Sequence, residues 1–181
     1  DMIRLDGAVS FGKWKFDGDA KGNYQENEYN DEGQVIGLKT TPYSYALDGL
    51  FVGDMPQTAY VMGATLTPIK GLRLQGILKM YDKNYSDWSP NAREYDGSDA
   101  DADRSQVWQA PGYNRLDLHG SYKLPKIGGL DMSINAHVFN ALDAVYVQDA
   151  VDNSQYNGFG DKLHLPHNAE VFLGTPRYAN I

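Results

Sequence analysis

An acidic run near the middle of the chain could do chemistry through its carboxylates. Residues 96–103 read Asp-Gly-Ser-Asp-Ala-Asp-Ala-Asp, so Asp99, Asp101 and Asp103 alternate with small residues. Carboxylates at every second position resemble the start of a loop that binds calcium through oxygen ligands. Gly97 stands at the wrong place for an EF-hand, however, and no Glu follows at the twelfth position. The run therefore predicts a solvated acidic loop, with calcium bound by the three aspartates as the alternative; no other cofactor is indicated.

Four histidines could bind a metal or move a proton: His119, His137, His164 and His167. In the strand pairing set out below, Asp117 lies opposite His137, and such a pair can orient a base. Polar pairs are also ordinary on the water-facing side of a sheet. The spacing of His164 and His167 does not define a metal site. Because the chain also has no P-loop, no Gly-x-Ser-x-Gly and no His-Glu-x-x-His motif, we expect that it is not an enzyme.

Five aromatic residues fall in stretches without strand patterning: Trp88, Tyr95, Trp108, Tyr156 and Phe159. Exposed aromatic rings in loops often stack on flat or amphipathic ligands such as sugars. Aromatic rings can equally pack loops against one another. The five residues are therefore candidate substrate contacts, and both interpretations stay open at this stage.

The composition excludes several classes of protein. The chain of 181 residues has no cysteine, which rules out disulfides, Cys-ligated zinc and thiol chemistry. Its net charge of -8 argues against nucleic acid as a partner. No run of about 18 apolar residues occurs, so a transmembrane helix is not expected. A hydrophobic content of 41%, with 19 Gly and 13 Tyr, suits strands that each bury one face.

Apolar and polar residues alternate at the start of the chain, which is the signature of β-strands. Residues 3–11 and 14–25 predict a hairpin with Gly12-Lys13 as its turn. In that hairpin Phe11 faces Trp14, and every apolar residue meets a residue on the same face.

Alternation continues further along the chain. Two more hairpins are predicted: residues 60–66 with 72–80 across the turn 67–71, and residues 116–124 with 130–138 across the turn 125–129. Both turns carry Pro and Gly, the residues that set turn dihedral angles. In the last hairpin one face is almost purely apolar, and the other carries Arg115, Asp117 and His119.

Strand length and loop length favour one kind of sheet. The predicted strands are about 10 residues long, and short turns alternate with long connections at 26–56, 82–112 and 142–176. Transmembrane β-barrels need strands of about 9–11 residues, short periplasmic turns and long external loops, whereas sandwich strands are usually about five or six residues long. We therefore expect an all-β fold of antiparallel, up-and-down transmembrane β-barrel strands. Because alternation alone does not separate a lipid-facing surface from a packed core, a soluble β-sandwich carbohydrate-binding module with a calcium loop is the alternative.

Aromatic residues are expected at the two ends of the strands, where a barrel leaves the hydrocarbon region. Trp14, Phe16 and Tyr122 are expected near the short turns, and Tyr24, Tyr60 and Tyr113 near the long loops.

Three motifs follow one another in the second half of the chain. Residues 110–122 read APGYNRLDLHGSY, residues 133–146 read SINAHVFNALDAVY, and residues 171–177 read VFLGTPR. In this order they resemble the late barrel segment of TonB-dependent receptors: a Pro-Ser/Gly-Tyr that leads into a strand, the signature N-V-x-N-L-F-N/D-x-x-Y, and the G-x-P-R element that opens the last strand. Asn140-Ala141-Leu142 stands where the family often has Asn-Leu-Phe, and residues 53–58 and 81–90 are also similar to segments of such receptors from Bacteroidetes.

The resemblance implies a function for the parent protein. Family barrels have about 22 strands, preceded by a plug domain and a TonB box. We therefore expect residues 1–181 to be the C-terminal part of the barrel, in a multi-pass protein of the bacterial outer membrane that imports a nutrient by energy-coupled transport. The implied partners are outer-membrane lipid, TonB through the missing N-terminal region, and a surface lipoprotein. A passive porin-like barrel is the remaining alternative.

Overall fold

The main element of the computed structural model, which describes residues 2–157 and 163–181, is one six-stranded antiparallel sheet. Its strands are β1 (Ile3–Phe11), β4 (Thr58–Leu66), β5 (Leu72–Asp82), β8 (Tyr113–Lys123), β9 (Ser133–Phe139) and β12 (Tyr178–Asn180). They lie in the order β1-β4-β5-β8-β9-β12, so each strand pairs with the one that follows it in this sheet. The expected all-β, antiparallel, up-and-down arrangement is confirmed; among the described residues the sheet is open, with β1 and β12 at its edges.

The predicted hairpin of β4 and β5 is confirmed, but its register differs by two residues from that of a turn at 67–71, because Leu66 lies opposite Leu74 and not opposite Leu72. Tyr60 pairs with Met80 and Ala64 pairs with Gly76, so the apolar residues still share one face. The β8–β9 hairpin is also confirmed, but its register differs from the prediction by two residues. His137 lies opposite His119 and not opposite Asp117, because the turn is wider than expected and Leu124 N–H bonds to the Met132 carbonyl at 3.0 Å. The expected Asp117–His137 pair is therefore wrong.

The first predicted hairpin is wrong as well. Residues 3–11 form β1, but they pair with β4, from Ile3 opposite Leu66 to Phe11 opposite Thr58. Both pairings put apolar residues on one face, so alternation does not choose between them. The chain leaves the sheet after Phe11, and Trp14 and Phe16 consequently lie at the long-loop end of the sheet and not at its short turns.

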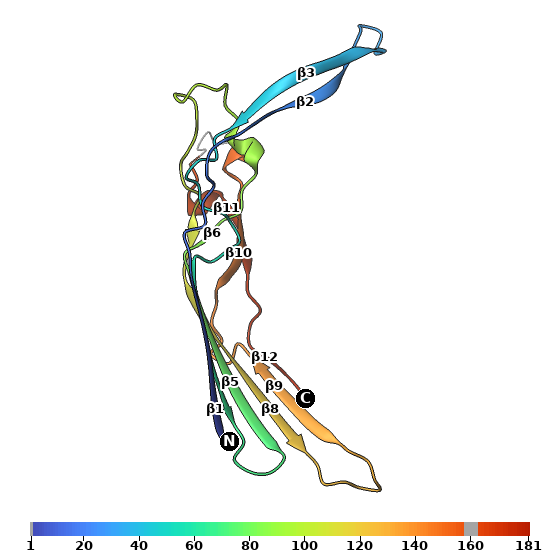
Figure 1. Ribbon diagram of the computed structural model, residues 1–181, viewed down its shortest axis with the longest axis vertical. Coiled ribbons are helices and arrows are strands. Elements are labelled where there is room, and N and C mark those ends of the chain that lie inside the picture. Colours follow the sequence, from blue (N-terminus) through green and yellow to red (C-terminus); the bar gives the residue numbers. More distant parts are fainter. Residues whose placement is uncertain (1, 158–162) are drawn as a thin grey trace.

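The long connections contain elements of their own. They are β2 (Ala20–Tyr29), β3 (Val35–Tyr45), β6 (Asn84–Tyr85), β7 (Gln109–Ala110), β10 (Val147–Asp152) and β11 (Ala169–Leu173), with 3-10 turns η1 (Pro90–Arg93), η2 (Ser154–Tyr156) and η3 (Pro166–Asn168). Two of these, β2 and β3, are as long as the strands of the six-stranded sheet. Figure 1 shows the six-stranded sheet with its short turns at the lower end, the connections gathered above it, and the β2–β3 hairpin projecting from the top. Among the described residues no helix is long and apolar enough to cross a membrane.

In the central strands of the sheet some polar-face residues are buried while the apolar face is exposed, and both faces of β1 are exposed. Leu5, Met62 and Leu118 share the apolar face with exposed fractions of 77%, 49% and 42%. On the polar face Thr65 and Asp117 are only 6% and 2% exposed. Because no described element covers the apolar face, the buried apolar core lies elsewhere, in the loops: Leu47, Leu50, Trp88 and Val107.

Candidate functional site

The three long connections meet at one end of the sheet and form a joined group, called here the loop assembly: residues 12–57, 83–112 and 140–177 without 158–162. Leu47 and Leu50 of the first connection pack against Trp88 and Val107 of the second. Backbone bonds join the second to the third, because Asp87 N–H bonds to the Ala150 carbonyl at 2.7 Å and Asp152 N–H to the Asp87 carbonyl at 2.8 Å. The loops are therefore one packed structure above the sheet.

An ion pair fastens the first connection to the second. The guanidinium of Arg104 donates two hydrogen bonds to Asp19, at 2.5 and 2.9 Å, which is the bidentate geometry of a strong pair. The Tyr95 hydroxyl donates to the same carboxylate at 2.8 Å, and the backbone N–H groups of Leu47 and Asp48 donate to it as well. The Arg104 bonds hold the pKa of Asp19 far below its usual value, so this carboxylate is ionised over the physiological range.

A chain of alternating charges fastens the second connection to the third. Arg93, whose side chain is fully buried, contacts Asp103 at 3.1 Å. The other oxygen of Asp103 contacts His164 Nε2 at 2.8 Å, and His164 Nδ1 contacts Asp152 at 2.5 Å. The order along the chain of contacts is thus guanidinium, carboxylate, imidazole and carboxylate. A buried charge is tolerated only when it is paired, so this arrangement is a specific connection between the two loops.

Ser154 joins the same cluster, which places a Ser, a His and an Asp together. The Ser154 hydroxyl lies 2.8 Å from His164 Nδ1 and donates to Asp152 Oδ1 at 2.6 Å. In a nucleophilic relay, the two nitrogens of the imidazole serve the hydroxyl and the carboxylate separately. Here Ser154 and Asp152 share Nδ1, and Asp103 occupies Nε2. The arrangement suits a structural clasp and not activation of the serine.

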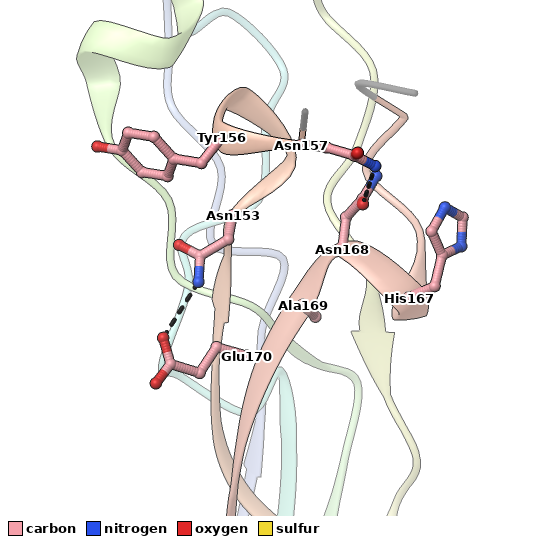
Figure 2. Close-up of a pocket in the computed structure, with 7 residues that line it drawn as sticks. All are labelled: Asn153, Tyr156, Asn157, His167, Asn168, Ala169 and Glu170. Atoms are coloured by element: carbon pink, nitrogen blue, oxygen red, sulfur yellow. Dashed lines mark hydrogen bonds between the residues drawn. The ribbon is translucent and has the colours of Figure 1, made fainter. Parts of the chain in front are cut away.

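An open pocket of about 590 Å³ lies beside this cluster. Its lining comes from the end of β10, from η2, and from η3 and β11: Asn153, Tyr156, Asn157, His167, Asn168, Ala169 and Glu170. Figure 2 shows two hydrogen bonds across it, from Asn153 Nδ2 to Glu170 at 3.1 Å and from Asn157 Nδ2 to Asn168 at 2.7 Å. Amide groups, a carboxylate and a Tyr ring that is 76% exposed give the pocket groups for hydrogen bonding and for ring stacking.

The structure separates the five aromatic candidates. Trp88 and Tyr95 are buried, with exposed fractions of 6% and 8%, and they pack the loop assembly. Trp108 is half-buried, and its carbonyl accepts the Ser86 hydroxyl at 3.1 Å. Tyr156 alone among the four described candidates lines the pocket. Phe159 lies outside the described residues.

The three candidate calcium ligands have different surroundings in the structure. Asp99 contacts Arg104 at 3.2 Å, Asp101 is exposed, and Asp103 is engaged by Arg93 and His164. In the described part of the chain no group of three or more His, Cys, Asp or Glu side chains is placed to hold a metal ion. The sequence indicated the acidic run but not its contact with His164, because His164 lies in a different connection, 61 positions further along the chain.

Another carboxylate in the loop assembly has an unusual environment. Partial burial of its carboxyl raises the pKa of Asp54 to about 7, and a hydrogen bond and negative charge from Asp149 act in the same direction. Asp54 also has a positive φ of 57°, a conformation that Asn and Gly accept most easily.

Comparisons with protein-family models, with curated proteins and with solved structures find no match to this chain. No family is shown by them. Its function is therefore argued from the sheet, the loop assembly and the pocket.

Proposed function

We propose that this chain forms membrane-crossing strands of an outer-membrane β-barrel, in a receptor of the TonB-dependent type whose loop assembly binds a nutrient outside the cell. The observation that carries the proposal is the uncovered apolar face of the six-stranded sheet. Leu5, Phe11 and Leu118 are all more than two-fifths exposed, while Asp117 on the other face is buried. A bilayer is the solvent that favours this arrangement, since it accepts apolar side chains and leaves the polar face to a lumen.

Strand lengths and connections support the same proposal. β1 and β4 have 9 residues each, and β5 and β8 have 11 each, which is the length a tilted strand needs to cross a bilayer. Short turns lie at one end and the loop assembly at the other, as in outer-membrane barrels. In this proposal further strands of the parent chain pair with the edges of β1 and β12, because lipid does not tolerate open edges.

The ligand-binding part of the proposal rests on the pocket beside η2 and η3. Its Asn, Glu and Tyr side chains suit a polar ligand with a flat or ring-shaped part. Energy coupling through TonB, a plug domain and a surface lipoprotein partner follow from the motif resemblance alone. Uptake of the ligand by cells with and without TonB would separate this receptor from a passive porin.

The membrane orientation is tested with one charge placed on either face at the same depth. Leu118→Arg puts a cation on the apolar face near the middle of β8, and Gln75→Arg puts one on the polar face in the next row of the sheet. A lipid-facing Arg near the bilayer midplane costs about 2–4 kcal/mol, so we expect L118R to block assembly of the parent protein into outer membranes and Q75R to assemble normally.

Assembly is measured by the fraction of the parent protein that resists heat unfolding in a detergent gel. Equal loss in both variants would contradict the membrane orientation. A parent protein that stays soluble without detergent would instead favour the β-sandwich, in which another layer covers the apolar face.

A further inference from the structure

His164 connects the two walls of the pocket. One wall of the pocket consists of Asn153, Tyr156 and Asn157, which follow β10 directly. In the same segment, Asp152 and Ser154 both contact His164 Nδ1. The other wall starts at η3, only two residues after His164. One backbone bond holds the same junction, from the Asn153 N–H to the Asn168 carbonyl at 2.9 Å, and the Asn168 N–H bonds to the Leu165 carbonyl within the second wall. A change at His164 is therefore expected to alter the distance between the two walls of the pocket.

The protonation state of His164 decides how many of its contacts are hydrogen bonds. Both ring nitrogens face carboxylate oxygens, Asp152 on Nδ1 and Asp103 on Nε2. Only the imidazolium donates from both nitrogens; the neutral ring donates from one and faces a carboxylate with a lone pair from the other. The contact with Asp152 is the more shielded of the two, because these side chains are 6% and 5% exposed while that of Asp103 is 44% exposed.

We propose that the contacts of His164 with Asp103 and Asp152, called here the clasp, hold the pocket together while His164 is protonated. When His164 loses its proton, these contacts are released. This inference takes the pocket to be the ligand site proposed above. Its test reads loop geometry and needs no ligand, so the two proposals can fail separately.

The charged groups around His164 set the pH range of the clasp. The hydrogen bond to Asp152 raises the pKa of His164, the bond to Asp103 adds to this, and the nearby Arg93 opposes it. The bonds from His164 lower the pKa of Asp103 and of Asp152 against the effect of burial. A raised histidine pKa gives a contribution that is complete below the unfolded value and is lost as pH rises through the folded value. The clasp is therefore closed below the ordinary histidine pKa and opens as pH rises through the higher pKa of His164 in the folded protein.

The experiment measures the distance between the second and third connections as a function of pH. Since this chain has no cysteine, Asp101→Cys and Leu165→Cys place one spin label on each side of the clasp, at exposed positions. The labelled protein is the full parent chain in detergent, with any cysteine elsewhere replaced. Pulsed electron–electron double resonance is recorded from about pH 6 to about pH 9.5, a range that extends well above the ordinary histidine pKa. We expect a narrow distance distribution at the acidic end and a broad one at the alkaline end, along a one-proton curve.

Two variants identify the group that titrates. His164→Gln is expected to give the broad distribution at every pH, because Gln carries no charge to hold two carboxylates. His167→Gln changes a residue that lines the pocket three positions further on and is expected to keep the transition of the unchanged clasp. An unchanged distribution across the pH range in the labelled parent would overturn the proposal, and so would the same transition in H164Q.

Discussion

Asp19 and Arg104, 85 positions apart, form a two-bond ion pair at 2.5 and 2.9 Å that joins the first long connection to the second. Arg104 also contacts Asp99, and Tyr95 completes the environment of Asp19. The pair stands at the junction from which the β2–β3 hairpin projects, since β2 starts at Ala20 (Figure 1). It therefore fixes the base of that projecting hairpin.

Removing the Asp19 charge should loosen the base of the hairpin. Asp19→Asn leaves Arg104 with one exposed partner, Asp99, and weakens the bonds to the Leu47 and Asp48 backbone. We expect limited proteolysis to cut residues 12–57 several-fold faster while the six-stranded sheet stays intact. Asp31→Asn, in the exposed turn between β2 and β3, is the matched control. Equal cleavage of both variants would show that the pair does not hold the hairpin.

The Asp19 interaction should also survive acid. Because the pKa of Asp19 is lowered in the folded protein, its contribution is present above the unfolded value and is lost only as pH falls through the lower folded value. The protease pattern of the unmodified chain is therefore expected to be the same at about pH 4, near the ordinary Asp value, as at neutral pH.

Asp54 gives the opposite pH dependence. Its pKa of about 7 lies above the unfolded value, so the folded loop assembly binds a proton that the unfolded chain releases. Stability should fall as pH rises from about 4 to about 7 and then stay level. Asp54→Asn removes the charge next to Asp149 and suits the positive φ. At alkaline pH we expect it to add about 1 kcal/mol, a value reduced for solvent screening at this exposed residue.

Chemical unfolding of D54N and of the unmodified chain, followed by tryptophan fluorescence at several pH values, checks this expectation. A matched control is Asp48→Asn, an exposed aspartate in the same connection. If D54N unfolds with the same pH dependence as the unmodified chain, Asp54 is not the group responsible.

Asn140 closes the end of β9 and anchors the segment before β12. Its side-chain amide donates to the carbonyls of Ala144 at 2.9 Å and Thr175 at 3.1 Å, and its side-chain oxygen accepts the Ala144 N–H at 3.0 Å. Its backbone N–H bonds to the buried Asp117. Asn140→Ala removes the side-chain partners of the Ala144 carbonyl, the Ala144 N–H and the Thr175 carbonyl, at a residue that is 2% exposed. It also places Ala at a φ of 49°.

We expect N140A to lower the free energy of unfolding by about 2–3 kcal/mol, the range for unpaired buried polar groups. Asn135→Ala, on the exposed part of β9, should change it little. Urea unfolding of the refolded parent protein in lipid vesicles measures both. A small effect in N140A would mean that water replaces the lost partners.

Gly174 leaves room for the ring of Tyr146. A Cβ at position 174 would overlap the ring of Tyr146 at its Cζ atom. The ring has little freedom to move, because it stacks on Tyr113 with centroids 4.2 Å apart and Tyr146 is 5% exposed. Gly174→Ala is expected to destabilise the protein by about 2 kcal/mol, as over-packing does elsewhere.

A double variant isolates the contact. Tyr146→Ala removes the ring, so G174A should cost much less in the Y146A background than alone. The measurement is again the urea midpoint of the refolded parent protein. Additive effects of the two substitutions would show that the clash is relieved by movement of the backbone.

The sequence by itself determined most strands of the six-stranded sheet and the two faces of that sheet. It missed β3, which lies in residues predicted to be a long connection. Period-two alternation is a local property, so it predicted which residues of β5 and β8 share a face. It placed both hairpin turns correctly along the chain, but each hairpin register differs by two residues from the prediction, which leaves the faces unchanged. Asn140 and Gly174 lie in motifs that the sequence alone singled out, and the structure supplies the contacts that require them.

Only the tertiary structure decided which strands pair and how the loops are joined. β1 satisfies the same alternation against residues 14–25 and against β4, and the choice depends on where the chain goes after Phe11. The clasp brings His164 to Asp103 across 61 positions. Ion pairs of this kind leave no periodic signal, because side chains from separate loops meet only after the sheet has placed the ends of those loops together.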